Sequence, residues 1–323
     1  MSLPRNRIIV GDALATMRTL PSTSVDMVLT SPPYLGLRDY KIAGQLGQER
    51  HVDSWVEPLR AVAQEAARVL VPTGTLWLNV GDSYSIHTEQ GAERKSLLLG
   101  PERLVLALTA DGWLLRNKII WQKPNPMPTS VRDRLACTWE YIYVLARNPS
   151  YYFDLDAVRR PHRSRPSATR RAVLASSDDH RGPNSMGTSG LLKLKANGLV
   201  GHPLGANPGD VLRLASSNYR GGHRATFPLG LADYALRAGC PEARCTGCRR
   251  PHVRRVLRAL GGTAVRSALG PTCDCTYGRE PGIVLDPFMG AGTTALAARA
   301  LHRDWLGVEL SPTFAQEARS RIA

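Results

Sequence analysis

The segment GIVLDPFMGAGTT, residues 282–294, joins a short apolar strand to a glycine turn and the start of a helix. Asp286 ends the strand, and Gly290 and Gly292 lie in the turn. Glycines let the backbone approach a ligand closely, and the helix that begins near Thr293 offers unpaired N–H groups at its N-terminus. The pattern predicts a ligand-binding turn at the end of a strand; a plain strand-to-helix turn is the alternative.

The residues that follow this turn indicate the kind of ligand. Glu309 ends the next strand, Trp305–Glu309, where a carboxylate can accept hydrogen bonds from both hydroxyls of a ribose. Ala295 stands where a pyrophosphate-binding Gly-x-Gly-x-x-Gly turn would have its third glycine. A nucleoside without a pyrophosphate is therefore the favoured ligand.

The position of the turn near the end of the sequence predicts a circularly permuted sheet. Only 14 residues follow Glu309, enough for one helix over Pro312–Ile322. The remaining strands of this half-sheet must therefore come from earlier in the chain. The strand Arg7–Val10 is the expected neighbour, and Asp12 brings a third acidic group to the same edge.

The first half of the chain alternates apolar strands with amphipathic helices. In the expected helix Trp55–Leu70, apolar residues recur at spacings of three and four, which places them on one stripe. The alternation predicts an α/β fold with a mostly parallel, Rossmann-like sheet and helices on both faces. The other expected elements are strands at Val25–Thr30, Gly74–Val80, Leu114–Trp121 and Trp139–Ala146, and a helix over Pro101–Asp111.

A second motif, Ser31-Pro32-Pro33-Tyr34, follows the expected strand Val25–Thr30. Two prolines remove backbone N–H groups and fix φ, so Ser31 and Pro32 present carbonyl oxygens that a regular strand cannot pair. An exposed hydroxyl, rigid acceptors and an aromatic ring at a strand's carboxyl end suit a planar amine held for attack. Taken alone, the motif could also be an ordinary turn.

The charge balance indicates a polyanionic partner. The chain has 323 residues, with 42 Lys and Arg against 27 Asp and Glu, a formal net charge of +15 and a pI of about 10.0. Such a surface is typical of proteins that bind nucleic acid, with anionic membranes and acidic proteins as alternatives. No window approaches the ~18 apolar residues of a membrane span, and no signal peptide pattern opens the sequence, so a cytoplasmic protein without membrane association is expected.

Four cysteines form two close pairs in the last third of the chain. Cys245 and Cys248 are separated by two residues, and Cys273 and Cys275 by one. Four thiolates suit a tetrahedral Zn²⁺ site, and a small insertion with little core of its own would gain folding energy from the metal. Cys240 is close enough to be a substitute ligand, and ordinary free cysteines are the alternative.

Both motifs together resemble the beta class of amino-methyltransferases, which act on exocyclic nitrogens of DNA bases and whose catalytic tetrapeptide precedes the cofactor turn. The resemblance covers most of the chain, and the order of the segments is as informative as their content. Besides Ser31–Tyr34 and Asp286–Thr294, the segments are Asn6–Leu14, Gly74–Asp82, Trp121–Pro124, Thr138–Glu140 with Tyr152–Asp154, and His223–Pro228.

The resemblance implies S-adenosylmethionine as cofactor and assigns residues to it and to the target base. Ser31 and the Pro32 carbonyl are expected to hold the target amine, beside Pro33, while Tyr34 stacks on the flipped base. The residues expected around the cofactor, with Glu309 on its ribose and Asp12 near its adenine, also include Phe227, Pro228, Asp286, Phe288, Gly290, Gly292 and Thr293.

The resemblance also implies double-stranded DNA as partner, with target recognition between the catalytic and cofactor regions. Residues 157–218 carry nine Lys and Arg between Arg159 and Lys195 against two Asp, so a DNA-contacting surface is favoured over a solvated linker. The expected DNA-binding residues are Arg159, Arg160, Arg163, Arg165, Arg170 and Arg171. The other expected regions are a catalytic part at 1–156, a cofactor-binding part at 219–239 and 276–323, and a zinc-binding insertion at 240–275.

The resemblance also gives expectations for the target base and for the biological setting. Serine at the first position of the tetrapeptide is typical of cytosine-N4 enzymes in this family and favours cytosine N4 over adenine N6. Carbon-5 methylation needs a cysteine after proline, and no Pro-Cys pair occurs; Cys137, which has no nearby partner, is expected in the core. A cognate restriction endonuclease is a candidate partner, and the chain is expected as a monomer or homodimer.

Three other interpretations have less support from the sequence. Methylation of RNA or of a protein amide uses similar planar-amine chemistry. A DNA-binding zinc protein that has lost activity is the third, and the intact Ser31, Tyr34, Asp286 and Glu309 argue against it.

Overall fold

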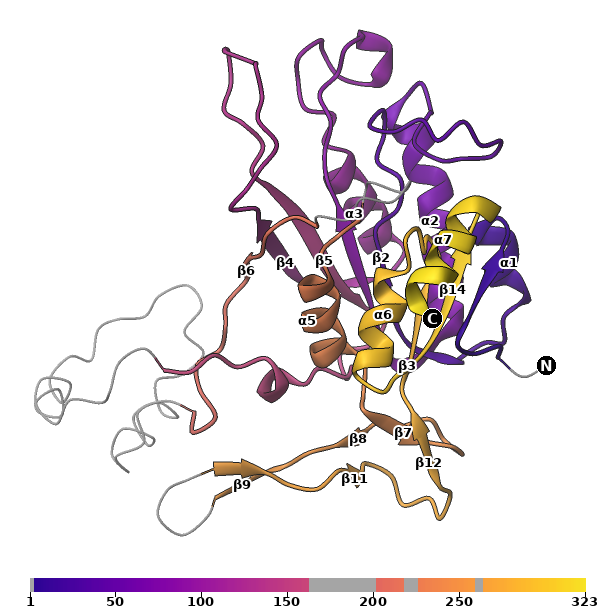
Figure 1. Cartoon of the computed structure of the whole chain (residues 1–323), viewed down its shortest axis with the longest axis vertical. Coiled ribbons are helices and arrows are strands. Elements are labelled where there is room, and N and C mark those ends of the chain that lie inside the picture. Colours follow the sequence, from indigo (N-terminus) through magenta and orange to yellow (C-terminus); the bar gives the residue numbers. More distant parts are fainter. Residues whose placement is uncertain (1–2, 163–201, 218–225, 259–263) are drawn as a thin grey trace, which may run out of the picture. The chain divides into compact units, whose positions relative to one another are not determined.

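Figure 1 shows the computed structural model, in which two compact units are described separately. The described residues are 3–162, 202–217, 226–258 and 264–323. The first unit comprises Met1–Asp154, Gly209–Val253 and Gly270–Ala323, and the second comprises Leu155–Pro208 and Arg254–Leu269. The first unit thus unites the residues around both motifs and all four paired cysteines, whereas the four expected regions stay predictions.

An eight-stranded sheet forms the centre of the first unit. Its strands are β1 (Arg7–Val10), β2 (Val25–Thr30), β3 (Leu70–Val80), β4 (Leu114–Gln122), β5 (Trp139–Ala146), β6 (Val211–Arg213), β13 (Ile283–Asp286) and β14 (Asp304–Glu309). They lie in the order β1-β14-β13-β2-β3-β5-β4-β6. Within this described sheet, only β5 runs antiparallel to its neighbours, β3 and β4, so the expected mostly parallel sheet is confirmed.

The predicted permutation is confirmed by the pairing of the two ends of the chain. β1 lies parallel to β14, with Arg7 opposite Leu306 and Val10 opposite Glu309. β13 lies beside β2, and from these two strands the chain continues to opposite sides of the sheet, to β14 and to β3. In open α/β sheets, ligands bind outside the carboxyl ends of the strands at such a switch point.

Helices cover both faces of this sheet. They are α1 (Ala13–Thr19), α2 (Val52–Val69), α3 (Gly100–Ala110), α5 (Leu229–Gly239), α6 (Thr293–Ala300) and α7 (Pro312–Ile322), with a 3-10 turn η1 (Thr88–Gln90). Helices α1, α2 and α3 lie on one face, and α5, α6 and α7 on the other (Figure 1). Met17, Trp55 and Leu104 from the first three helices pack with Leu76 and Leu285 of the sheet in one buried core.

Short strands occupy the remaining described residues. In the first unit, β7 (Ala243–Cys245) pairs with β12 (Arg279–Pro281), and β8 (His252–Val253) with β11 (Gly270–Pro271). The second unit has a 3-10 turn η2 (Leu155–Ala157) and a two-stranded sheet of β9 (Val256–Arg258) and β10 (Ala264–Arg266). None of the helices among the described residues is both long and apolar enough to cross a lipid bilayer.

Candidate active site

A cavity of about 800 Å³ lies at the carboxyl ends of β1, β2, β13 and β14, which is the predicted ligand edge of the sheet. It is lined by parts of both sequence motifs, so the fold brings together segments that lie more than 250 residues apart. The predicted site residues in its lining are Asp12, Ser31, Pro32, Pro33, Tyr34, Phe227, Phe288 and Glu309. The predicted residues behind the lining are Pro228, Asp286, Gly290, Gly292 and Thr293.

A chain of hydrogen bonds fixes the loop that follows β2. The indole N–H of Trp55 in α2 donates to the Pro33 carbonyl at 2.9 Å, which holds the loop against the core. The Tyr34 hydroxyl donates to Glu140 Oε2 at 2.8 Å and lies 3.2 Å from Ser31 Oγ. A phenol has one proton, so once it is given to Glu140, Tyr34 accepts the proton of Ser31. The lone pairs of Ser31 Oγ are then available to a ligand in the cavity.

Glu140 of β5 is a functional candidate to which sequence reasoning assigned no role. Its Oε2 also accepts the side-chain amide of Asn79 at 3.1 Å, and Lys123 donates to its Oε1. Burial, followed by the charge of Glu140, raises the pKa of Tyr34 well above its usual value, so the phenol keeps its proton. Asn79, Lys123 and Glu140 all lie in segments that carry the sequence resemblance, but only the pairing of the strands reveals that the three side chains meet.

Asp286 holds the turn after β13 in place from behind the cavity wall. Its carboxylate accepts from the hydroxyls of Thr30 at 2.7 Å and Thr294 at 2.6 Å, and from the Phe288 N–H at 3.1 Å. Burial raises its pKa to about 6, and these hydrogen bonds act in the opposite direction. Asp286 therefore joins β2, β13 and α6 and positions Phe288, which does line the cavity.

Glu309 combines a structural role with an acceptor in the cavity lining. Its two carboxylate oxygens accept the N–H groups of Gly290 at 2.8 Å and Ser311 at 2.9 Å, and burial raises its pKa. A carboxylate has about four lone-pair sites, so acceptor capacity is left for the hydroxyls of a ribose. Gly292 begins α6 with φ +77°, and a Cβ there would lie 2.8 Å from Ile322 Cδ1, so this position requires glycine.

The remaining lining suits the aromatic base of a nucleoside. Phe227, Phe288 and Phe314 line the cavity, and the ring of Tyr40 lies 5.6 Å from that of Phe314 in an edge-to-face arrangement. Asp12 caps α1 by accepting the Ala15 N–H at 2.8 Å and also lines the cavity. Cavities of roughly 300–1,000 Å³ hold ligands of this size. The residues present therefore fit a nucleoside cofactor with a second planar group beside it.

The predicted DNA-binding arginines are only partly described. In the second unit, the Arg159 guanidinium forms an ion pair with Asp156 at 2.5 Å and is mostly buried, whereas Arg160 is exposed. Arg163, Arg165, Arg170 and Arg171 lie outside the described residues. Their contact with DNA stays a prediction.

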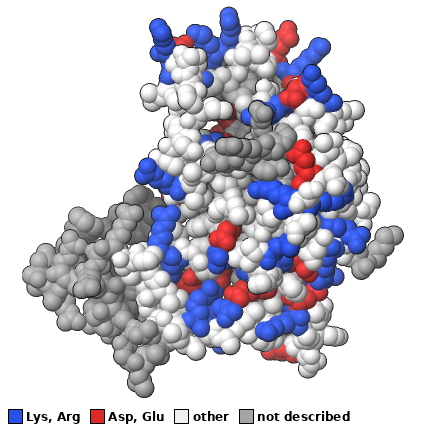
Figure 2. Space-filling model, in the orientation of Figure 1, with Lys and Arg blue, Asp and Glu red and all other residues white. Residues whose placement is uncertain are grey.

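Further basic side chains lie in the first unit, on loops that follow β3 and β4. Lys95 and Arg132 are exposed, and the Arg134 guanidinium stacks 3.7 Å from the centre of the Tyr84 ring. Figure 2 shows Lys and Arg side chains in this upper part of the view, where the loops of Figure 1 extend. The loop after β4 also contributes Met127 and Pro128 to the cavity lining, so Arg132 and Arg134 lie on a segment that reaches the site.

Four of the six cysteines lie together, as the sequence predicts, whereas Cys240 and Cys137 lie elsewhere. The sulfurs of Cys245, Cys248, Cys273 and Cys275 all lie within 4.8 Å of one another. Cys240 is buried and lies outside this cluster. The expectation that Cys137 is a core residue is wrong, because it is exposed on the loop after β4 and lines the cavity, with its sulfur 3.9 Å from the Tyr84 hydroxyl.

Comparisons with known proteins place the chain in a family. The sequence matches the DNA methylase family over residues 25–320. The type II methyltransferase M.SmaI of Serratia marcescens is 31% identical over 337 residues, which cover 98% of this chain and 90% of that protein. M.SfiI of Streptomyces fimbriatus, also a type II methyltransferase, is 45% identical over 177 residues, 52% of this chain and 42% of that protein.

Solved structures share the fold. The PvuII DNA methyltransferase (cytosine-N4-specific) superimposes with a TM-score of 0.61 at 17% identity, covering 100% of this chain and 88% of that one. A putative DNA modification methylase from Thermus thermophilus, complexed with S-adenosyl-L-methionine, gives 0.56 at 22% identity, with 98% and 93% covered. The α/β methyltransferase fold predicted from the sequence is thereby confirmed.

Proposed function

The chain belongs to the DNA methylase family, and on this premise we propose that it transfers a methyl group from S-adenosylmethionine to the exocyclic N4 of a cytosine flipped out of double-stranded DNA. One observation carries the proposal. Ser31 and Tyr34 share a cavity with Phe288 and Glu309 across the β2–β13 switch point, so an amine acceptor and a nucleoside site face the same space.

The residues of the first motif would prepare the amine for attack. An exocyclic amine is a poor nucleophile because its lone pair is delocalised into the ring. The hydroxyl of Ser31 and the carbonyl of Pro32 would accept its two hydrogens and favour a pyramidal nitrogen. Such positioning of reactants, at about 3–3.5 Å, provides much of the rate enhancement in reactions of this kind.

The cofactor, when bound, supplies the methyl group as an electrophile on sulfur. An amine that receives a methyl group would gain positive charge and would have to lose one proton. Ser31, Tyr34 and Glu140 form a continuous hydrogen-bonded line from the cavity to a carboxylate, at 3.2 Å and 2.8 Å. We expect this line to stabilise the developing charge and to lead the proton away.

The choice of cytosine depends on the first residue of the motif. Cytosine and adenine both present an amine beside a ring nitrogen that accepts hydrogen bonds, so the geometry of the loop accommodates either base. Ser31 favours cytosine by the family resemblance. The product of the reaction, N4-methylcytosine or N6-methyladenine, therefore tests this part of the proposal directly.

The partners follow from charge and from the relatives. The net charge of +15 and the exposed cations on the loops near the cavity support binding to duplex DNA. M.SmaI and M.SfiI are named type II methyltransferases, which supports a role in modification beside a restriction endonuclease that reads the same sequence. In this setting the second unit, with Arg159 and Arg160, would contribute to target recognition.

The experiment incubates the purified chain with duplex DNA and isotopically labelled S-adenosylmethionine and identifies the labelled nucleoside by mass spectrometry. We expect labelled N4-methylcytosine. N6-methyladenine would overturn the base assignment and leave the family mechanism intact, whereas 5-methylcytosine or no labelled base would overturn the reaction itself.

Ser31→Ala is the matched variant for this assay. Removing one preorganised hydrogen-bonding group from a transition state typically lowers kcat by roughly 10²–10³-fold. Cofactor affinity, measured by calorimetry, should stay close to that of the unchanged chain because Ser31 contacts the base. Full activity of the variant would contradict the assigned role.

A further inference from the structure

The four clustered cysteines lie in a segment with little core of its own, here called the cysteine knuckle and defined as residues 243–253 and 270–281. Its strands β7, β8, β11 and β12 have only two or three residues each. Cys245 is buried, Cys273 is partly buried, and Cys248 and Cys275 are exposed. Strand pairs this short are not stable alone in water, so the fold of the knuckle needs another source of stability.

The arrangement of the sulfurs suits one metal ion better than disulfides. In a tetrahedral zinc site with bonds of about 2.3 Å, the sulfurs lie about 3.8 Å apart. The four sulfurs here lie within 4.8 Å of one another, and all four cysteines are free. In two disulfides, the sulfurs of each pair would lie about 2.05 Å apart, and nothing would require the two pairs to lie close together. The convergence of all four sulfurs on one point therefore favours a single metal ion.

The backbone around the first pair already has the shape of a metal-binding turn. The Cys245 N–H donates to the Arg250 carbonyl at 2.9 Å, and the Arg249 N–H donates back to the Cys245 carbonyl at 3.0 Å. Arg249 has φ +61°, which closes the turn, and the Thr246 N–H donates to the Gly278 carbonyl at 3.0 Å. The two cysteine-bearing segments are thus held side by side.

We propose that Cys245, Cys248, Cys273 and Cys275 bind one structural Zn²⁺ ion and that this ion keeps the cysteine knuckle attached to the amino-terminal ends of the sheet strands. All four positions are filled by protein sulfur, so the site has no open position for substrate. The role is therefore structural, and it is independent of the proposed methyl transfer.

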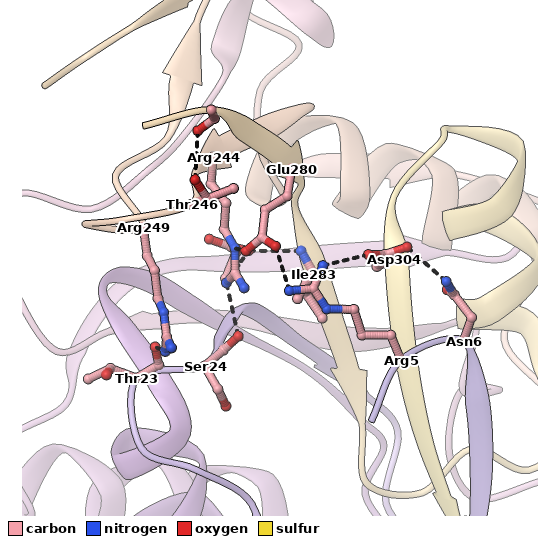
Figure 3. Close-up of polar contacts among 12 residues, drawn as sticks. Arg5, Asn6, Thr23, Ser24, Arg244, Thr246, Arg249, Glu280, Ile283 and Asp304 are labelled. Carbon is pink, nitrogen blue, oxygen red and sulfur yellow. Dashed lines mark hydrogen bonds and ion pairs between the residues drawn. The ribbon is translucent and has the colours of Figure 1, made fainter. Parts of the chain in front are cut away.

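Arg244, the residue before the first ligand, makes the attachment. Its side chain is buried, and its guanidinium contacts Asp26 Oδ2 at 3.0 Å, the Ser24 carbonyl at 2.9 Å and Glu280 Oε1 at 2.8 Å. Figure 3 shows Arg244 reaching from the knuckle toward Ser24 and Glu280. Asp26 lies in β2, the strand that ends at Ser31, and also accepts the Ile283 N–H at 2.8 Å.

Two further contacts extend the attachment across the sheet. Arg5, just before β1, bonds Glu280 at 2.6 Å and Asp304 at 3.1 Å, as Figure 3 shows. Arg249 donates to the carbonyl of Thr23, which precedes β2. The knuckle therefore contacts residues at the starts of β1 and β2 directly, and it is linked through Arg5 to the start of β14 and through Asp26 to the start of β13. The opposite ends of these four strands form the cavity.

The first test measures metal in the full chain. We expect about one zinc per chain after purification from zinc-supplemented medium, and cobalt exchange should give the visible and near-ultraviolet bands of a tetrahedral thiolate complex. Cys275→Ser should lose most of the zinc under competition with a chelator. Cys137→Ser is the matched control, because Cys137 is also exposed but lies outside the cluster, and it should keep the metal.

The results that would overturn the metal site are equally defined. A wild-type chain without zinc that also gives no tetrahedral cobalt spectrum would do so. Zinc retention by Cys275→Ser equal to that of Cys137→Ser would remove the assigned ligand set. These readouts need no DNA and no cofactor, so failure of the methyltransferase proposal would leave them unaffected.

Hydrogen exchange tests the attachment separately. Removing zinc with a chelator should increase amide exchange in residues 243–253 and also at the starts of β2 and β13, because the Ile283 N–H is bonded to Asp26 beside Arg244. Increased exchange confined to the knuckle would show that the metal does not support the sheet and would overturn this second part.

Discussion

Two buried aspartates at opposite ends of neighbouring strands show how differently the two edges of this sheet are built. Asp26 lies near the start of β2, and Asp286 ends β13. Burial raises the pKa of each to about 6. Asp26 is held by the cation of Arg244, whereas the contacts described for Asp286 are two hydroxyls and one backbone N–H.

The difference corresponds to what each edge must do. At the amino-terminal edge an ion pair fixes the cysteine knuckle, and a buried pair is costly to break because the remaining charge has no partner. At the carboxyl edge, neutral donors orient Asp286 and the turn that follows it. The cavity lining there carries the carboxylates Asp12, Glu140 and Glu309 together with the cations Arg38 and Lys123, of which Lys123 is paired with Glu140. Substitutions at the amino-terminal edge should therefore act mainly on stability, and substitutions in the cavity lining at the carboxyl edge should act mainly on ligand binding.

The largest expected effect is on stability and comes from Arg244→Met. Breaking one side of a buried ion pair typically costs about 3–5 kcal/mol of unfolding free energy, because Asp26 stays buried without its cation. Urea unfolding of the full chain measures this. The double variant Asp26→Asn with Arg244→Met should recover part of the loss, since it removes the unpaired charge as well.

Arg237→Met is the control for this change. Arg237 forms an exposed ion pair with Asp233 on α5 at 2.7 Å, and exposed pairs contribute about 0–1 kcal/mol. A loss for Arg244→Met no greater than that for Arg237→Met would contradict the ionic clamp. Failure of the double variant to recover any stability would locate the effect in packing instead of charge.

The second prediction concerns pH and expects the two edges to behave alike. A carboxyl whose pKa is about 6 when folded, against 3.8 as its ordinary value, binds more protons in the folded state between those values. Its contribution to stability is complete at low pH and is lost as the pH rises through about 6. Asp286→Asn and Asp26→Asn should each therefore cost about 1–2 kcal/mol more at about pH 4.5 than at about pH 7.5.

Urea unfolding of both variants and the unchanged chain at the two pH values provides the measurement. Comparing differences removes the acid sensitivity of other carboxyls, such as Glu280, whose pKa is lowered beside Arg5 and Arg244 although burial opposes the shift. A substitution cost that grows with rising pH at either edge would contradict the direction given for that carboxyl.

The sequence was sufficient for the fold because the decisive signals are local. Apolar strands, glycine turns and helix periodicity gave β1, β2, β5 and α7 with their observed bounds and most other elements within a few residues. The permutation followed from a count, since the 14 residues after Glu309 could not complete the sheet, and β1 does pair with β14. Such inferences need only strand chemistry and topology.

The parts that the sequence did not supply depend on long-range pairing. Glu140, Asn79 and Lys123 meet because β5 lies between β3 and β4 in a particular register, which periodicity does not determine.

The burial of single residues was also not predictable. Cys137 was assigned to the core from its residue type, but the loop after β4 exposes it. Arg244 is one of many arginines in the sequence, and only burial distinguishes it.

The smallest expected effect is on catalysis and comes from Glu140→Gln at the carboxyl edge. A carboxylate can only accept, so it fixes the direction of the Tyr34 and Ser31 hydroxyls, whereas an amide can also donate to Tyr34 and reverse them. We expect kcat to fall about tenfold, roughly 1.4 kcal/mol, with KM for the cofactor unchanged, because Glu140 acts through Tyr34 as a positioning residue. Glu102→Gln, which removes a surface ion pair between α3 and Lys118, should leave kcat unchanged. Two results would contradict this prediction: an equal loss of kcat in the two variants, or a loss for Glu140→Gln that appears only in KM. Either result would show that the direction of the Tyr34–Glu140 hydrogen bond does not matter for catalysis. The carboxyl edge would then differ from the amino-terminal edge in charge alone.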